Sequence, residues 1–142
     1  MNAITIRTNN SADGIAKISR LWQDVMCGKT SLVLGTDIIL ISKYSNYASE
    51  ETGDYDLSIL AVDSEFLHKL DEECTAEKYK KYDITSDDND IPLNTKRAWQ
   101  QVWQDTQNGR IKRVYTEDYE CSIPANYSPD GKLHCLLYIA IK

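Results

Sequence analysis

Residues 57–62 read Leu-Ser-Ile-Leu-Ala-Val, and a second apolar run, His-Cys-Leu-Leu-Tyr-Ile, stands 77 positions later at residues 134–139. A second pair of landmarks has the same separation, because Leu-Trp-Gln-Asp-Val at 21–25 returns as Ala-Trp-Gln-Gln-Val at 98–102. A fixed offset between two landmarks indicates a duplicated structural unit. The sequence therefore predicts a fold with pseudo-twofold symmetry, in which each copy carries a Trp-bearing helix before a pair of strands.

The first copy, expected at about residues 1–76, shows clear periodicities. Residues 3–7 alternate in polarity, which predicts a strand, and apolar residues from Ile15 to Met26 recur at helical spacing. Gly28 is placed to end that helix. The other strands are expected at 32–34, bending at Gly35 into 38–44, and at 55–62, where apolar residues on both faces indicate a central strand.

The second copy, expected at about residues 77–142, repeats the order of strand, helix and two strands. Pro92 is suited to the first turn of a helix, and Asn108-Gly109 to its end. The stretch at 65–77 fits either a short helix or a covering loop. Strands are expected at 78–85, 119–123 and 133–141, with 114–115 extended as well. At 142 residues, both copies fit within one domain.

Composition excludes several classes of protein. The formal net charge is −6, whereas nucleic-acid binding requires a basic face. The start of the chain lacks the pattern of a secretory signal, and no apolar run is long enough to cross a bilayer. We therefore expect a soluble, cytoplasmic protein. The spacing of the four cysteines and two histidines gives no metal site, and we expect neither a metal nor a cofactor.

The aromatic residues are unusual in kind, with three Trp and nine Tyr against one Phe. Tyr and Trp rings combine a flat apolar body with a polar group, which suits a pocket for flat, partly charged organic molecules. Trp22 and Trp99 also lie at helical spacing, which is typical of core residues. Both interpretations, ligand contact and core, are open at these two positions.

Glu120 is the charged residue of greatest interest. It lies in a short strand and alternates with Tyr119 and Cys121, so that it shares a face with Asp118 and Ser122. One interpretation is a carboxylate on a solvated strand face. The other is a carboxylate at the bottom of an apolar groove, where its desolvation would favour an organic cation.

These residues resemble a known family. Thr-Glu-Asp-Tyr-Glu at 116–120, a loop with Pro and Gly, and Leu-Tyr-Ile-Ala-Ile-Lys at 137–142 resemble the closing signature of the GyrI-like family. This family includes the effector-binding domains of AraC-type and MerR-type transcription regulators. The helix at 97–103 resembles the helix that precedes the signature, and 21–22 and 44–47 resemble the matching elements of the first repeat.

The resemblance implies an α+β fold of two β-α-β-β units, with a curved antiparallel sheet, helices on one face and a central groove. In the family this groove binds hydrophobic, often cationic, small molecules, and an acidic residue at the position of Glu120 neutralises their charge. The ligand-binding residues that we predict are Glu120, Tyr138, Trp22, Trp99, Tyr44, Tyr47, Tyr55 and Trp103.

The resulting hypothesis is a stand-alone module that binds amphipathic cations and either sequesters them or reports them to a separate regulatory protein. The predicted module takes up the whole sequence, so no helix-turn-helix or direct contact with nucleic acid is expected. An alternative is a hydrolase of small molecules that uses Glu120 with Tyr138 or Tyr47. Another alternative is a protein-interaction module such as a gyrase inhibitor.

Overall fold

The structure is a computed structural model that describes residues 2–32, 35–36, 38–49 and 53–142. The chain divides into two compact units. Unit 1 comprises Met1–Leu67 with Tyr115–Glu117, and unit 2 comprises His68–Val114 with Asp118–Lys142. The predicted repeat boundary near residue 76 stays a prediction, because these units are defined by contacts and not by common ancestry.

In unit 1, three strands form an antiparallel sheet with β3 in the middle. The elements are β1 (Ala3–Thr8), α1 (Ala12–Met26), β2 (Ile39–Ser45) and β3 (Tyr55–Val62). β3 pairs with β1 on one side and with β2 on the other. The prediction that residues 55–62 form a central strand is therefore confirmed, as is the first strand.

Helix α1 begins and ends where its sequence predicts. The Ser11 side chain accepts a hydrogen bond from the backbone N–H of Gly14 and caps the first turn. Gly28, just after the helix, has a φ of +72°, a conformation that glycine adopts without strain. One face of the helix packs Leu21 and Val25 against Ile59 of β3, which forms the core of unit 1.

The second segment of the predicted bent strand is confirmed from Ile39 onward, whereas most of the first segment lies outside the described residues. β2 begins at Ile39, and Leu32 lies outside the strands, while residues 33–34 fall outside the described part of the chain. Leu32 packs against the α1 core from a loop.

In unit 2, the middle strand is β6 (Leu133–Ala140), which pairs antiparallel with both of its neighbours. Those neighbours are β4 (Tyr79–Ser86) and β5 (Glu117–Ile123). Helix α3 (Ile91–Gln107) follows β4, and a short 3₁₀ turn, η1 (Ala125–Tyr127), lies between β5 and β6. All three predicted strands of this half are therefore present.

The ends of α3 also follow the sequence. Asp90 caps the helix by accepting the backbone N–H of Leu93, Pro92 stands in the first turn, and Gly109 has a φ of +74° just beyond the last turn. Residues 64–75 form a helix, α2 (Ser64–Thr75), which decides between the helix and the loop expected there.

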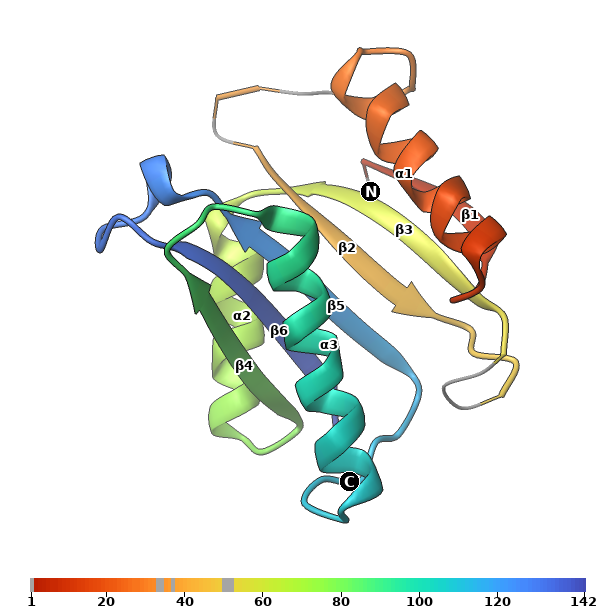
Figure 1. The fold of residues 1–142 in the computed structure, drawn as a ribbon, viewed down its shortest axis with the longest axis vertical. Helices are drawn as coiled ribbons and strands as arrows, with labels where there is room; N and C mark the ends of the chain where they lie inside the picture. The colour runs from red at the N-terminus through yellow and green to blue at the C-terminus, as the bar shows by residue number, and fades with distance from the viewer. Residues whose placement is uncertain (1, 33–34, 37, 50–52) are drawn as a thin grey trace. The chain divides into compact units, whose positions relative to one another are not determined.

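Helices α2 and α3 cover opposite faces of the unit 2 strands (Figure 1). Ala98 and Val102 of α3 pack with Leu137 of β6, whereas the hydroxyl of Tyr138, the next residue along β6, donates to Asp71 of α2 at 3.1 Å. The expectation that the helices all lie on one face is therefore wrong for this unit. Both faces of β6 are apolar, and each needs a helix over it to keep its side chains out of contact with water.

Among the helices of the described residues, none is long and apolar enough to cross a membrane.

Candidate functional site

Glu120 lies on the α3 face of the unit 2 sheet. It is paired in register with Leu137, whose side chain belongs to the α3 core, and Ser122 is paired with Cys135 of the same core. Directly opposed residues of antiparallel strands point to the same face of a sheet. The predicted parity of Glu120 with Ser122 is thus confirmed, and Glu120 itself is half-buried.

Two tryptophans of α3 accompany this carboxylate. The indole N–H of Trp99 donates to Oε1 of Glu120 at 2.7 Å. Trp103, one helical turn further on, lies with its ring centroid 6.3 Å from that of Trp99 and its plane tilted by 33°. Both tryptophans are half-buried, so Trp99 contacts the Glu120 carboxylate through its N–H and the Trp103 ring through its own ring at a partly exposed surface of unit 2.

An ion pair lies beside Trp99. The Arg113 guanidinium donates to Oδ2 of Asp118 at 2.8 Å, and the two side chains are only 3% and 0% exposed. The other Asp118 oxygen accepts the backbone N–H of Ala140 at 2.9 Å. The Arg113 guanidinium carbon lies 5.8 Å from the Trp99 ring centroid, within the range of a cation–π contact.

Four side chains are therefore linked in series: Asp118, Arg113, Trp99 and Glu120. These four side chains include two carboxylates and one guanidinium. Such a set can fix the orientation of one carboxylate beside aromatic rings. The sequence singled out Trp99 and Glu120 but missed Arg113, which lies outside the strands and forms a single bridge to Ile141.

Tyr138 is separated from Glu120 by the sheet itself. It is paired with Tyr119, on the face that α2 covers, and it is 1% exposed. Burial raises the pKa of its hydroxyl, and the Asp71 charge and hydrogen bond raise it further. Glu120 and Tyr138 therefore cannot act on one atom, because the two groups lie on opposite faces, and the hydrolase alternative with Glu120 and Tyr47 stays a prediction.

The predicted tyrosines of unit 1 do come together. The Tyr55 ring lies 5.4 Å from the Tyr44 ring and 5.9 Å from the Tyr47 ring, measured between centroids. Tyr115 completes the group with an edge-on contact to Tyr47 at 5.7 Å. Tyr55 is 3% exposed and its hydroxyl donates to Asn10, so it is a core residue of this tyrosine group.

Tyr115 was expected in an extended segment, and that expectation is wrong. Its φ is +60°, a left-handed conformation that is uncommon for a tyrosine. No short sequence pattern marks such a residue, because its ring contacts come from Tyr47, 68 positions away.

Trp22 packs against the core of unit 1, together with Ile4, Ile6 and Leu40. Of the two interpretations that the sequence left open for this residue, the structure shows the core contact.

The buried cysteines are unreactive. Burial raises the pKa of the Cys121 thiol to about 11 and that of Cys135 to about 12, and the Glu120 charge adds to both shifts. Because the thiolate is the nucleophile, thiols with such pKa values are inert near neutral pH.

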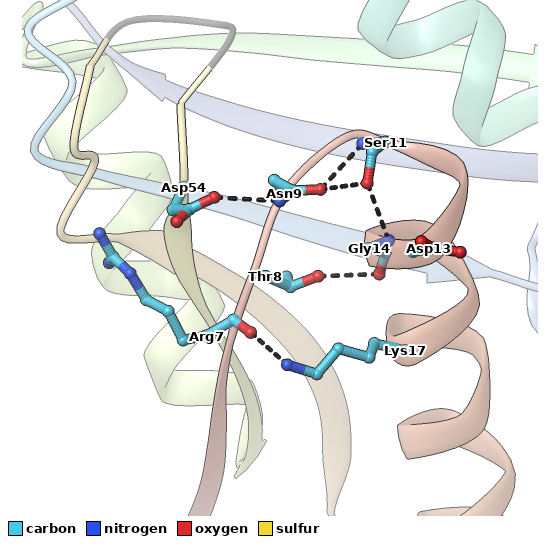
Figure 2. Close-up of a pocket in the computed structure, with 8 residues that line it drawn as sticks. All are labelled: Arg7, Thr8, Asn9, Ser11, Asp13, Gly14, Lys17 and Asp54. Carbon is cyan, nitrogen blue, oxygen red and sulfur yellow. Dashed lines mark hydrogen bonds between the residues drawn. The ribbon is translucent and has the colours of Figure 1, made fainter.

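A polar cavity of about 350 Å³ lies at the start of α1 in unit 1 (Figure 2). It contains none of the predicted ligand-binding residues. It is lined by Arg7, Thr8, Asn9, Ser11, Asp13, Gly14, Lys17 and Asp54.

The polar groups of this cavity bind one another. Lys17 donates to the backbone carbonyl of Arg7, Thr8 donates to that of Gly14, and Asn9 donates to Asp54. Figure 2 shows the Lys17 and Thr8 bonds joining the end of β1 to the first turns of α1, and the Asn9 bond joining the same end to the segment just before β3. Its lining pairs two cationic side chains, Arg7 and Lys17, with two carboxylates, Asp13 and Asp54, and includes no aromatic ring, so this cavity does not fit the predicted ligand.

No protein-family model and no curated protein matches the chain. The chain is similar in structure to an integron cassette protein, VCH_CASS2, whose crystal structure comes from the mobile metagenome of Vibrio cholerae. The TM-score is 0.64 at 22% sequence identity, over 100% of this chain and 92% of that chain. At this identity the similarity shows a shared fold alone. Membership of the GyrI-like family stays a prediction.

Proposed function

We propose that this protein binds flat, hydrophobic organic cations, and that Glu120 supplies the charge that pairs with them. The observation that carries the proposal is the half-buried Glu120 carboxylate, held by the Trp99 indole beside the Trp103 ring. A carboxylate among aromatic rings is suited to a ligand with a positive charge and an apolar body.

The environment of the carboxylate favours such a ligand over a small inorganic cation. A hydrated metal ion gains little from indole rings, whereas an organic cation can cover them and remove apolar surface from water. In addition, no group of three or more metal-ligating side chains occurs among the described residues. The ligand class is therefore defined by both charge and aromatic area.

The two units support a further part of the proposal, namely that they are diverged copies of one ancestral unit. Each has the order strand, helix, strand, strand, and in each the last strand pairs with the other two. Together with the repeated sequence landmarks, this favours a GyrI-like module. Its role would be to sequester the cation or to report it to a regulatory protein.

Titration of the intrinsic tryptophan fluorescence tests the proposal. The ligands are an N-methylacridinium salt and a cationic rhodamine ester, each beside a neutral analogue of similar shape. We expect saturable quenching by the cations, with midpoints near micromolar, and much weaker responses to the neutral analogues. Equal responses to both sets would leave a non-selective aromatic surface, and no response would contradict ligand binding at Glu120.

A further inference from the structure

Both the N–H and the ring of Trp99 already have partners within the protein. Its N–H donates to Glu120, and the Arg113 guanidinium lies on its ring. Arg113 is in turn held by Asp118, which is fixed by the backbone N–H of Ala140. A succession of buried contacts thus runs from the end of β6 to the indole of Trp99.

These contacts have a consequence for the carboxylate. A hydrogen bond from a neutral N–H to a carboxylate is stronger than one between neutral groups, and at 2.7 Å it restricts the side chain of Glu120. The Arg113 guanidinium already occupies the usual place of a cation over the Trp99 ring. Trp103, a turn away, contacts Trp99, and no cation–π contact to its ring occurs within the described part of the chain.

We propose that Trp99 is a positioning residue and not a stacking surface: its indole N–H orients the Glu120 carboxylate toward a bound cation and so sets charge selectivity. This inference rests on the proposed function. It predicts that removing the N–H costs affinity for cations and little affinity for neutral ligands, because only the cation uses the oriented carboxylate.

The test compares Trp99→Phe with Trp103→Phe, which changes the neighbouring tryptophan in the same way and serves as the matched control. Affinities of wild type and both variants for N-methylacridinium and for uncharged acridine are measured by isothermal titration calorimetry at mildly alkaline pH. In Trp99→Phe we expect cation binding about three- to tenfold weaker, as for the loss of one hydrogen bond, with acridine binding nearly unchanged. In Trp103→Phe the ratio of the two affinities is expected to stay at the wild-type value.

A Glu120→Gln background separates positioning from a general structural effect. If Trp99 acts through the carboxylate, Trp99→Phe has no further effect on charge selectivity in that background. An independent readout is the indole N–H resonance of Trp99 in a ¹⁵N-correlated NMR spectrum, which should move in Glu120→Gln while the Trp22 resonance stays in place.

Each outcome has a distinct meaning. If wild type binds the cation selectively but Trp99→Phe retains its full affinity, or binds more tightly, the positioning role is overturned and the proposed function stands. If wild type shows no selectivity for the cation, the proposed function fails and the inference fails with it. If both ligands weaken equally in Trp99→Phe, Trp99 is a structural residue or a stacking surface.

Discussion

The Arg113–Asp118 pair places two charges where almost no water reaches them. Removing one partner of a buried pair leaves the other charge without compensation, which is far more costly than losing an exposed pair. The pair also holds Arg113 over Trp99, so its effect extends to the candidate site.

We predict that Asp118→Asn lowers the free energy of unfolding by about 3 kcal/mol. The substitution keeps the shape of the side chain and removes only its charge. The control is Asp87→Asn, because Asp87 is 87% exposed and 3.9 Å from Lys132, and it should change stability by less than about 0.5 kcal/mol. Urea unfolding of both variants measures the difference, and similar values for the two would contradict the burial argument.

His134 lies between two carboxylates. Its Nδ1 is 2.7 Å from Asp83 and its Nε2 is 2.9 Å from Asp130. The hydrogen bonds to Asp130 and Asp83 raise the pKa of His134 above its ordinary value of 6.5. The pKa of Asp130 is lowered in turn. The largest cause is its hydrogen bond with His134, and hydrogen bonds from Ser128 and from the backbone N–H of Lys132 add to it.

The sign of the resulting pH dependence follows from these directions. The contribution of His134 to stability is complete below pH 6.5 and is lost as the pH rises through its folded pKa. The contribution of Asp130 is present above pH 3.8 and is lost as the pH falls through its lowered folded pKa.

We therefore predict that His134→Gln lowers the melting temperature more in mild acid than at alkaline pH. His68→Gln, at an exposed position of α2, is the control for a general effect of removing a histidine. A deficit independent of pH would show that His134 acts without its charge.

At the scale of elements, the junction between β1 and α1 leaves no room for a side chain at Gly14. A Cβ atom at Gly14 would lie 2.2 Å from the backbone oxygen of Asn9, too close for a side chain without movement of the backbone. The Gly14 N–H is bonded to Ser11 and its carbonyl to Thr8, so little movement is available.

Gly14→Ala is accordingly expected to destabilise the protein by about 1–3 kcal/mol, despite the better helix propensity of alanine. Gly35→Ala is the matched control, because among the described residues beyond its chain neighbours the nearest atom to its Cβ would be Cγ1 of Ile38, at 3.7 Å. That substitution should be neutral or stabilising by up to about 1 kcal/mol. Thermal unfolding followed by circular dichroism compares the two, and a stabilised Gly14→Ala would contradict the close contact.

The elements differ in how far the sequence could predict them. Helices α1 and α3 have apolar stripes and caps within their own residues, so local patterns predict them. Helix α2 is mostly polar, with Leu70 as its buried residue. Its position follows from the apolar face of β6 opposite α3, and β6 begins 58 positions after α2 ends. A pattern local to residues 65–77 cannot contain that information, which is why a helix and a loop fitted equally well.

The difference between local patterns and contacts from distant segments also explains how much of the candidate site the sequence could predict. The alternation in β5 was enough to place Glu120 opposite in parity to Tyr119 and Cys121. The pairing register, however, determines that Tyr119 opposes Tyr138, and this places Tyr138 on the α2 face. Contacts from distant segments, such as Arg113 on Trp99 and Tyr115 on Tyr47, have no local signature in the sequence.

At the scale of the whole molecule, each unit has one strand that pairs with both of the other strands of that unit. Those strands are β3 and β6, whereas β1 and β4 each pair with a single strand among the described residues. Strands with two hydrogen-bonded neighbours open only when the unit itself unfolds.

We predict that backbone amides of β3 and β6 exchange with deuterium more slowly than those of β1 and β4. Hydrogen exchange followed by mass spectrometry on peptides covering each strand measures this order. Faster exchange of β6 than of β4 would contradict the strand pairing of unit 2.

The most direct test of cation binding at Glu120 is the effect of Glu120→Gln on the affinities for N-methylacridinium and uncharged acridine, measured by calorimetry. The substitution keeps the shape of the side chain and removes its charge. Because Glu120 is half-buried, we predict that cation binding weakens by about 1–2 kcal/mol, while acridine loses much less. Equal losses for the two ligands, or no loss for the cation, would contradict charge pairing at Glu120.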